Sequence, residues 1–432
     1  MKKPFYQTNL IVKKKRNGWI ITSRLIFLIE TCRLVITCIM FNEKVLNRRE
    51  EDCVFLNEEL LKGIHSRAEM YDKENSFPHE DHVALKEAGY YKAFVPKEYG
   101  GHGLSLKEIA HEQTRLAKAA PATALGINMH QIIVGVGKYM VRHGNKKGEQ
   151  ILKDAVEGHL LSFAISEPAN DRVLFGSICE AKQEEDGGYR FYGPKVFISM
   201  VAECSRMVTY GMDENNGDPQ SVFAYVENNA GTIKIKPDWD TLGMRATQSY
   251  SVNLAGAYAS KESILTKVEP GPSFDPVVFG IFSHFEILLA ATYHGIGKRA
   301  LELGIESVKK RKSIAQGTTY DQDKNIRWRI AESALVLDSI QPQIDVLADD
   351  VENDSDHGDL WMPRLSAIKN YSVEASIKTV EEMVRASGGR SYYNDTELSR
   401  LLRDVYAGLF QPSDQESLHD SWATLLLGPI QK

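Results

Sequence analysis

Hydrophobic residues recur at helical spacing along the first regular part of the chain. Between residues 56 and 73 they fall at Leu56, Leu60, Leu61, Ile64 and Ala68, and acidic residues stand early in the segment. This spacing predicts an amphipathic helix. Residues 82–88 and 106–119 are predicted to form two further helices, and the apolar run 122–141 is predicted to be buried. We therefore predict an N-terminal helical domain over residues 52–160.

The pattern changes at residue 161, where short alternating or β-branched runs replace the helical spacing. These runs include SFAIS, YRFYG, KVFIS, SVFAYV and TIKIKP, and turn sequences rich in Asp, Asn and Gly separate them. Strands at this spacing are typical of a small antiparallel barrel or sandwich. Residues 161–270 are therefore predicted to form a middle β domain, a small antiparallel β-barrel.

Long helical patterns return after Gly271, Pro272 and Pro276, which we interpret as a linker. Helices are predicted over residues 286–312, 325–352 and 361–386, with a shorter one over 396–408. Long helices joined by short loops favour an antiparallel bundle over residues 271–432. The acidic segment 349–359 is predicted to be a solvated loop. The predicted fold class is thus multidomain α+β.

Residues 1–51 differ from the rest and are predicted not to belong to the fold. The first 39 residues hold eight Lys or Arg and one acid, Glu30. The apolar run 19–41 carries Arg24, Glu30 and Arg33, and charges within a bilayer are costly, so a membrane span is disfavoured. The preferred interpretation is an upstream-extended reading frame with synthesis starting at Met40. An amphipathic membrane anchor and a structured segment are the alternatives.

Composition narrows the class of protein. The 432 residues carry a formal net charge of −6, which disfavours nucleic acid as a partner. The five cysteines have no metal-binding or disulfide pattern, so we expect a reducing compartment, a cytoplasmic location and no metal site. No membrane association of the folded part is expected.

Two short motifs carry the candidate chemistry: LSFAISEPAND at 161–171 and KVFIS at 195–199. Each ends a strand with backbone amides, a small hydroxyl and an apolar face, an arrangement that suits a planar, polar heterocycle such as a flavin. The alternatives are a strand that ends in a Glu-Pro turn and a core aromatic residue on a barrel strand.

From about residue 52 to its end, the chain resembles the acyl-CoA dehydrogenase family in domain order and in the order of its motifs. FAISEPAND is similar to the family's Thr-Glu-Pro motif, and KVFIS to its Lys-x-Trp-Ile-Thr. The resemblance implies FAD, with FMN as the alternative. Phe163 and Ile165 would offer backbone groups to the flavin, and Ser166 its hydroxyl. Phe197 would cover one flavin face, and Ser199 would donate toward N5.

A third motif implies a site shared between subunits. Arg385-Ala-Ser-Gly388-Gly389 resembles the family's Gln-x-x-Gly-Gly, and Arg311 matches an arginine that also meets the FAD diphosphate. In the family these groups serve the cofactor of a neighbouring subunit, which implies a homotetramer or homodimer. The alternatives are a glycine helix stop and a solvated arginine at a helix end.

The resemblance fails at the catalytic base. Family members place a glutamate eight positions after an Arg-Asp pair, and here that position holds Pro412. Glu286 is the best remaining carboxylate candidate for removing an α-proton. A residue placed for its charge near a helix N-terminus is the alternative for Glu286. Asp414 and Glu416 are weaker candidates. The shortened Ala169-Asn170 turn also lacks the family's serine, so CoA binding is in question.

The sequence favours an FAD-dependent acyl-CoA dehydrogenase in fatty acid metabolism, which passes electrons from an acyl-CoA to an acceptor flavoprotein. The tail 403–412 also resembles flavin-dependent monooxygenases of the dibenzothiophene desulfurisation type. These take reduced flavin from a flavin reductase and need no α-proton base. A non-catalytic flavin-binding scaffold is the third hypothesis.

Overall fold

Helices form the first part of the fold in the computed structural model, which describes residues 55–214 and 217–431. They are α2 (Glu58–Glu74), α3 (His79–Glu87), α4 (Leu106–Ala119), α5 (Pro121–Arg142) and α6 (Gly148–Val156). Helix α4 has the predicted bounds because a capping box of Ser105 and Glu108 starts it. The expectations for residues 1–51 concern a segment outside the described residues.

The middle part is one mixed sheet of eight strands. These are β1 (Leu161–Ala164), β2 (Glu180–Gln183), β3 (Tyr189–Ile198), β4 (Arg206–Asp213), β5 (Gln220–Glu227), β6 (Ile233–Lys236), β7 (Tyr250–Ala259) and β8 (Ile264–Val268). Their order is β6-β7-β3-β2-β4-β5-β8, and β1 joins beside β4. Because β1 and β2 both pair with β4 in parallel, the prediction of a wholly antiparallel domain was wrong at these two pairings.

Helices form the last part. They are α7 (Pro276–Lys310), α8 (Lys324–Asp338), α9 (Gln341–Glu352), α10 (Trp361–Ser387), α11 (Glu397–Val405) and α12 (Gln415–Leu427). A hairpin of β9 (Lys312–Ser313) and β10 (Thr318–Thr319) follows α7. The predicted linker was wrong at Pro276, because Asp275 caps α7 there. The single helix predicted over 325–352 is two helices, and Pro342 stands in the first turn of the second.

The acidic segment 349–359 is a solvated loop only beyond residue 352, because residues 353–359 are mostly exposed but 349–352 belong to a helix. Asp349 and Glu352 belong to α9, where they accept hydrogen bonds from Lys107 at 2.5 Å and Lys138 at 2.7 Å. Asp354 pairs with Arg142 in the same way. The segment therefore fastens α9 to α4 and α5.

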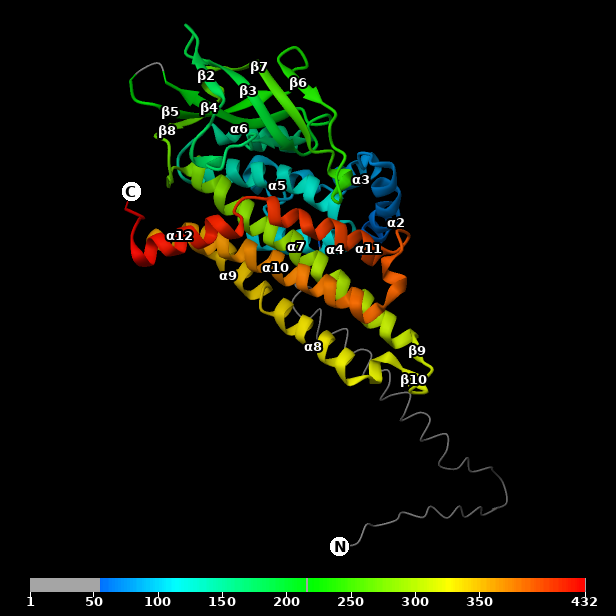
Figure 1. Ribbon diagram of the computed structural model, residues 1–432. Helices are drawn as coiled ribbons and strands as arrows, with labels where there is room; N and C mark the ends of the chain where they lie inside the picture. Colours follow the sequence, from blue (N-terminus) through cyan, green and yellow to red (C-terminus); the bar gives the residue numbers. More distant parts are fainter. Residues whose placement is uncertain (1–54, 215–216, 432) are drawn as a thin grey trace, which may run out of the picture. The chain divides into compact units, whose positions relative to one another are not determined.

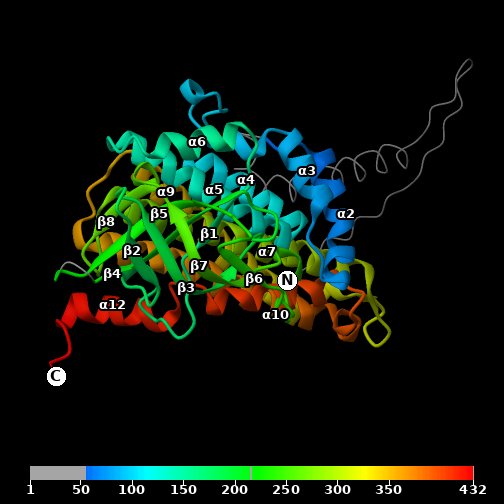
Figure 2. The same cartoon turned by 90° about the horizontal axis from the view of Figure 1, so that it is seen from above.

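Helix α7 is the central helix of the fold. It packs against α10, α4 and α5, and most of its residues up to Leu301 are buried. It is long and apolar enough to span a membrane by length and composition, but 83% of its most apolar window is buried inside the protein. Figure 1 shows that α7 begins beside the sheet and ends at the β9–β10 hairpin, away from the sheet. Figure 2 shows the sheet beside α5 and α6, seen from above.

Candidate flavin site

The two sequence motifs lie side by side where β1 and β3 end. The Val196 amide donates to the Ser166 carbonyl at 2.9 Å, which ties the second motif to the first. Ile165 is buried, while Phe163 and Ser166 are half-buried. The structure therefore brings Phe163, Ile165 and Ser166 next to the strand that carries Phe197 and Ser199, as the flavin hypothesis requires.

A buried ion pair holds these two segments together. Lys195 donates to Glu167 Oε1 at 2.5 Å and to the Tyr210 carbonyl at 2.9 Å, and both charged side chains are inaccessible to solvent. Glu167 also accepts from the Ile178 amide at 2.7 Å. Burial alone would raise the pKa of Glu167, but the charge of Lys195 and the donated hydrogen bonds outweigh it and lower that pKa.

The same carboxylate fixes the shortened turn after the first motif. The Asn170 side chain donates to Glu167 Oε2 at 2.7 Å and to the Gly176 carbonyl at 2.8 Å. Asn170 is therefore turned inward, toward the ion pair. It does not replace the outward serine hydroxyl that the resemblance would have supplied.

Phe197 is held in an unusual conformation at the end of β3. Its ring is 63% exposed, and its φ is +61°, a region that non-glycine residues rarely adopt. Trp239 lies edge-on to it, with ring centroids 6.2 Å apart. Met200 also has a positive φ, and so do Met244 and Gln248, which flank the Thr247 carbonyl that accepts from the Met200 amide. Such strain gathers at ligand sites, and an aromatic ring kept out of the core suits stacking on a flavin.

Ser199 begins a chain of buried hydroxyl groups. Its Oγ lies 2.8 Å from Ser249 Oγ, which in turn lies 2.8 Å from Thr247 Oγ1, and Ser162 donates to the Ser199 carbonyl at 2.6 Å. A hydroxyl with a hydroxyl neighbour can accept from it and direct its own proton elsewhere. Ser199 can therefore donate to a bound ring nitrogen while keeping a protein partner.

Glu286 does not lie at a helix N-terminus but inside α7, where it is 1% exposed. Its neighbour Phe285 faces β1, with its ring centroid 6.0 Å from that of Phe163. The Glu286 carboxylate points to the C-terminal turn, where it accepts from the Ser413 amide at 3.0 Å and the Ser413 hydroxyl at 2.7 Å. Burial raises the pKa of Glu286 to about 7, against the opposing effects of Lys369 and Ser413.

The other two carboxylate candidates are placed less well. Asp414 caps α12 by accepting from the Ser417 amide at 2.8 Å. Glu416 is exposed on the first turn of that helix. Neither carboxylate is buried, and Pro412 stands in the turn next to them.

The third predicted cluster forms at the far end of α7. Arg311 donates to the Ala386 carbonyl at 3.0 Å, and its guanidinium lies over the Tyr320 ring. A side chain on Gly388, whose φ is +71°, would meet this guanidinium at 2.8 Å. The space around Gly389 is open. Arg385 is 63% exposed, and its guanidinium lies 3.9 Å from the Glu382 carboxylate.

This cluster cannot reach a flavin ring bound at Phe163 in the same chain. Arg311 stands 26 residues after Phe285, which is about 40 Å along a helix that rises about 1.5 Å per residue. The two halves of the predicted site are therefore separate within one chain. They can act on one cofactor only when two copies meet.

Several residues of the site were not predicted from the sequence. Glu167 and Lys195 belong to the two sequence motifs, but the sequence analysis assigned them no role. The available signal was one acid and one base, each beside an apolar strand end, because such charges are rarely buried unless they are paired. Trp239, Ser249 and Thr247 come from the loop before β7 and from its edge, and no local pattern marks them.

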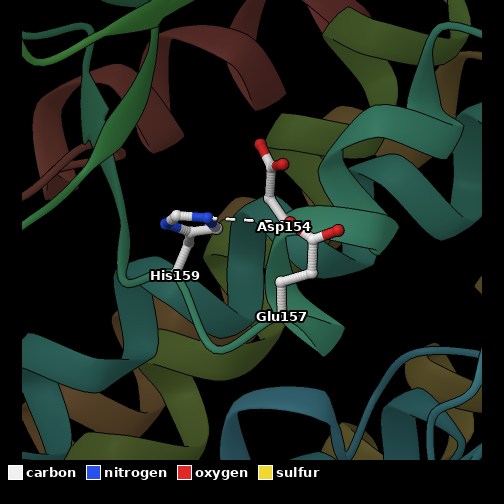
Figure 3. A group of neighbouring side chains, drawn as sticks. All are labelled: Asp154, Glu157 and His159. Atoms are coloured by element: carbon white, nitrogen blue, oxygen red, sulfur yellow. Dashed lines mark ion pairs between the residues drawn. The ribbon is translucent and has the colours of Figure 1, made fainter.

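One group of potential metal ligands lies away from this site. Asp154 in the last turn of α6 lies beside Glu157 and His159, which follow the helix (Figure 3), with ligand atoms within 4.8 Å of one another. Asp154 is already bound by the Tyr225 hydroxyl at 2.8 Å and by Arg206 at 3.2 Å. The cluster is explained as an anchor between α6 and the sheet.

Comparison with known proteins agrees with this geometry. Residues 54–158 match the N-terminal domain of acyl-CoA dehydrogenase, and residues 287–410 match its C-terminal domain. The chain therefore belongs to the acyl-CoA dehydrogenase family. The predicted fold class is confirmed, and the flavin expected from the motifs is the cofactor of this family.

Relatives within the family differ in chemistry. Amino sugar nitrososynthase DnmZ of Streptomyces peucetius is 25% identical, over 82% of this chain and 87% of its own. Mitochondrial isovaleryl-CoA dehydrogenase of Arabidopsis thaliana is 24% identical, over 85% and 87%. The FMN-bound structure of TdsC from Paenibacillus sp. A11-2 has a TM-score of 0.76 and 20% identity, covering 86% of this chain and 96% of TdsC.

Proposed function

We propose that this flavin-dependent enzyme is a monooxygenase that receives reduced flavin from a separate reductase and oxidises a small organic molecule. The observation that carries the proposal is the state of the candidate base. Pro412 occupies the position where the resemblance expects a carboxylate, and Glu286 is buried and held by Ser413. Oxygenation requires no α-proton base, so neither feature obstructs it.

The residues of the site have distinct roles in this proposal. A bound reduced flavin would supply two electrons and two protons, so that one atom of O₂ enters the substrate and the other leaves as water. Phe197 would cover a face of the ring and limit its contact with water, because its own ring stands free of the core. Ser199 would donate to the ring edge, and the Glu167–Lys195 pair would keep both strand ends in register.

Two further findings support oxygenation over thioester oxidation. TdsC is described as a dibenzothiophene monooxygenase, and DnmZ as a nitrososynthase, so family members of this kind act on substrates other than acyl-CoA. The inward Asn170 leaves no hydroxyl at the turn where CoA binding would be expected.

We further propose that the cofactor is FAD shared between two copies of the chain, as a homodimer or homotetramer. The support is the built cluster of Arg311, Arg385, Gly388 and Gly389, which lies about 40 Å along α7 from the ring site. Two arginines and an open glycine turn suit a diphosphate. FMN has no diphosphate and would leave this cluster without a ligand.

Acyl-CoA dehydrogenation is the second candidate, and Glu286 is the observation that favours it. A general base works best with a pKa near the operating pH, and burial raises the pKa of Glu286 to about 7. Its Oε2 has no protein partner. For this role Ser413 would have to release the carboxylate so that it could turn toward the Phe163 side of α7.

An oxygenation assay with a coupled flavin reductase tests the proposal. Purified protein is mixed with FAD, NADH, a flavin reductase and a panel of aromatic and amine substrates, and the oxygenated products are quantified by mass spectrometry. We expect product only when protein, reductase and O₂ are all present. Product formation without a reductase, or no product from any substrate together with bleaching by an acyl-CoA, would refute the proposal. Flavin binding with neither reaction would favour the scaffold hypothesis.

A further inference from the structure

Residues 411–413 form a turn that is held from the α10 side by one buried lysine. Lys369 is completely buried, and its ammonium group donates to the carbonyls of Gly408 at 2.8 Å, Gln411 at 2.6 Å and Ser413 at 2.9 Å. An ammonium group has three donors, so all of them are used on this segment. Asn370, the next residue of α10, also donates to the Ser413 carbonyl at 2.9 Å.

The α7 side holds the same turn with a carboxylate. Glu286 accepts from both the amide and the hydroxyl of Ser413, and Ser366 of α10 donates to that hydroxyl at 2.9 Å. The acid and the lysine therefore act on one turn from two helices. Burial lowers the pKa of Lys369 to about 8, while the carboxylates of Glu286, Asp414 and Glu374 favour its charged form and limit this decrease.

The clamped turn and β1 contact different faces of the same stretch of α7. Phe285 packs against Phe163 of β1, and the next residue, Glu286, accepts hydrogen bonds from Ser413. Farther along α7, Tyr293 lies against the same C-terminal segment, because a side chain on Gly408 would meet its ring at 2.9 Å. A shift of residues 408–413 would therefore disturb α7 at Tyr293 and at Glu286, beside the Phe285 ring that packs on Phe163.

We propose that Lys369 and Glu286 are positioning residues that hold the 411–413 turn against α7, keep Phe285 packed on Phe163 through that helix, and so keep water away from the flavin ring. The proposal rests on the proposed function, in which Glu286 transfers no α-proton. A loosened turn lets the reduced flavin pass both electrons and both protons to O₂ without a substrate. The products are then oxidised flavin and hydrogen peroxide, so loss of the clamp appears as uncoupling.

Three variants of the full-length, flavin-loaded protein test this. Lys369→Met removes the three charge-assisted hydrogen bonds while keeping an unbranched side chain. Glu286→Leu removes the acceptor for Ser413, and Glu286→Gln keeps a carbonyl acceptor in its place. Lys378→Met is the matched control, because Lys378 lies on the same helix, is 53% exposed and makes one ion pair with Glu332.

The readouts are hydrogen exchange of the peptide that contains residues 408–414 and the rate at which O₂ reoxidises the bound reduced flavin, followed at 450 nm without substrate. Loss of one charge-assisted hydrogen bond corresponds to roughly 10- to 100-fold faster exchange. We expect that increase, together with faster reoxidation, for Lys369→Met and Glu286→Leu. Glu286→Gln keeps an acceptor for Ser413 but loses the charge that faces Lys369, so it should show a smaller increase than Glu286→Leu. Lys378→Met should behave as wild type.

Unchanged exchange in both Lys369→Met and Glu286→Leu would overturn the clamp. Faster exchange with unchanged reoxidation would overturn the positioning role and leave the turn a structural element. If Lys369→Met does not fold, Glu286→Leu and Ser413→Ala decide the question by the same two readouts. Anaerobic bleaching by an acyl-CoA would refute the proposed monooxygenase without altering the exchange result, so the two failures can be told apart.

Discussion

The buried ion pair between Glu167 and Lys195 gives the sharpest prediction about the flavin site. Lys195→Met leaves the Glu167 carboxylate buried with only neutral donors, among them the Ile178 amide. Removing one partner of a buried pair typically destabilises a protein by about 3–5 kcal/mol. Total stabilities are about 5–15 kcal/mol, so the single variant loses a large share. Because the pair joins both motif strands, flavin affinity should fall as well.

The double variant Glu167→Gln/Lys195→Met leaves no charge behind. Replacing both partners by neutral groups of similar volume is often neutral or stabilising, so the double variant should recover most of the loss. Lys182→Met is the control, because Lys182 is 54% exposed in its pair with Glu180, and an exposed pair contributes at most about 1 kcal/mol.

Urea unfolding at pH 7.5, followed by tryptophan fluorescence, measures these differences. The reasoning requires that the double variant be more stable than Lys195→Met. A Lys195→Met loss below about 1 kcal/mol, or a double variant less stable than the single one, would refute the assigned role of the pair.

Three further predictions concern the same site and its distant half. The pKa of Glu167 is lowered from 4.5, so the stability it contributes is present above that pH and is lost as pH falls below it. Acid titration should therefore show a smaller loss of folding stability in the Glu167→Gln/Lys195→Met variant than in wild type. Ser199→Ala should weaken flavin binding about 2- to 10-fold, the equivalent of one hydrogen bond, and unchanged affinity by fluorescence titration would count against the N5 role. Arg311→Leu should lower the retention of FAD but leave the binding of added FMN unchanged, as measured by gel filtration of the loaded protein. Equal losses of both flavins would mean that Arg311 acts on the fold and not on a diphosphate near Gly388.

Local sequence patterns predicted the helices and strands that follow a single hydrophobic period. The helix over 106–119 has a capping box and a following proline, so both ends were visible in the sequence. Pro276 was misinterpreted as part of a linker, because a proline suits the first turn of a helix as well as a break. The parallel pairing of β1 and β2 with β4 depends on contacts far apart in sequence, which no local pattern contains.

The two motifs of the candidate site were read from the sequence and lie side by side in the structure, but the contacts that join them were not predicted. Phe163 and Ser199 were chosen as candidates because a flavin site needs backbone groups and hydroxyls at the ends of strands. The direction of Glu286 was not predictable, because a helix position shifts by about 100° per residue and only the packing of α7 sets the face. The roles of Lys369 and Ser413 depend on a contact between residues 44 positions apart.

The most direct test of the central claim is the absorbance of the bound flavin during anaerobic titration with a panel of acyl-CoA thioesters. Dithionite provides the control for complete reduction, and an authentic acyl-CoA dehydrogenase provides the control for the thioesters. The account predicts that the oxidised band near 450 nm persists with every thioester, while dithionite removes it. Stoichiometric bleaching by any acyl-CoA, lost again in Glu286→Gln, would contradict the account and establish Glu286 as the base.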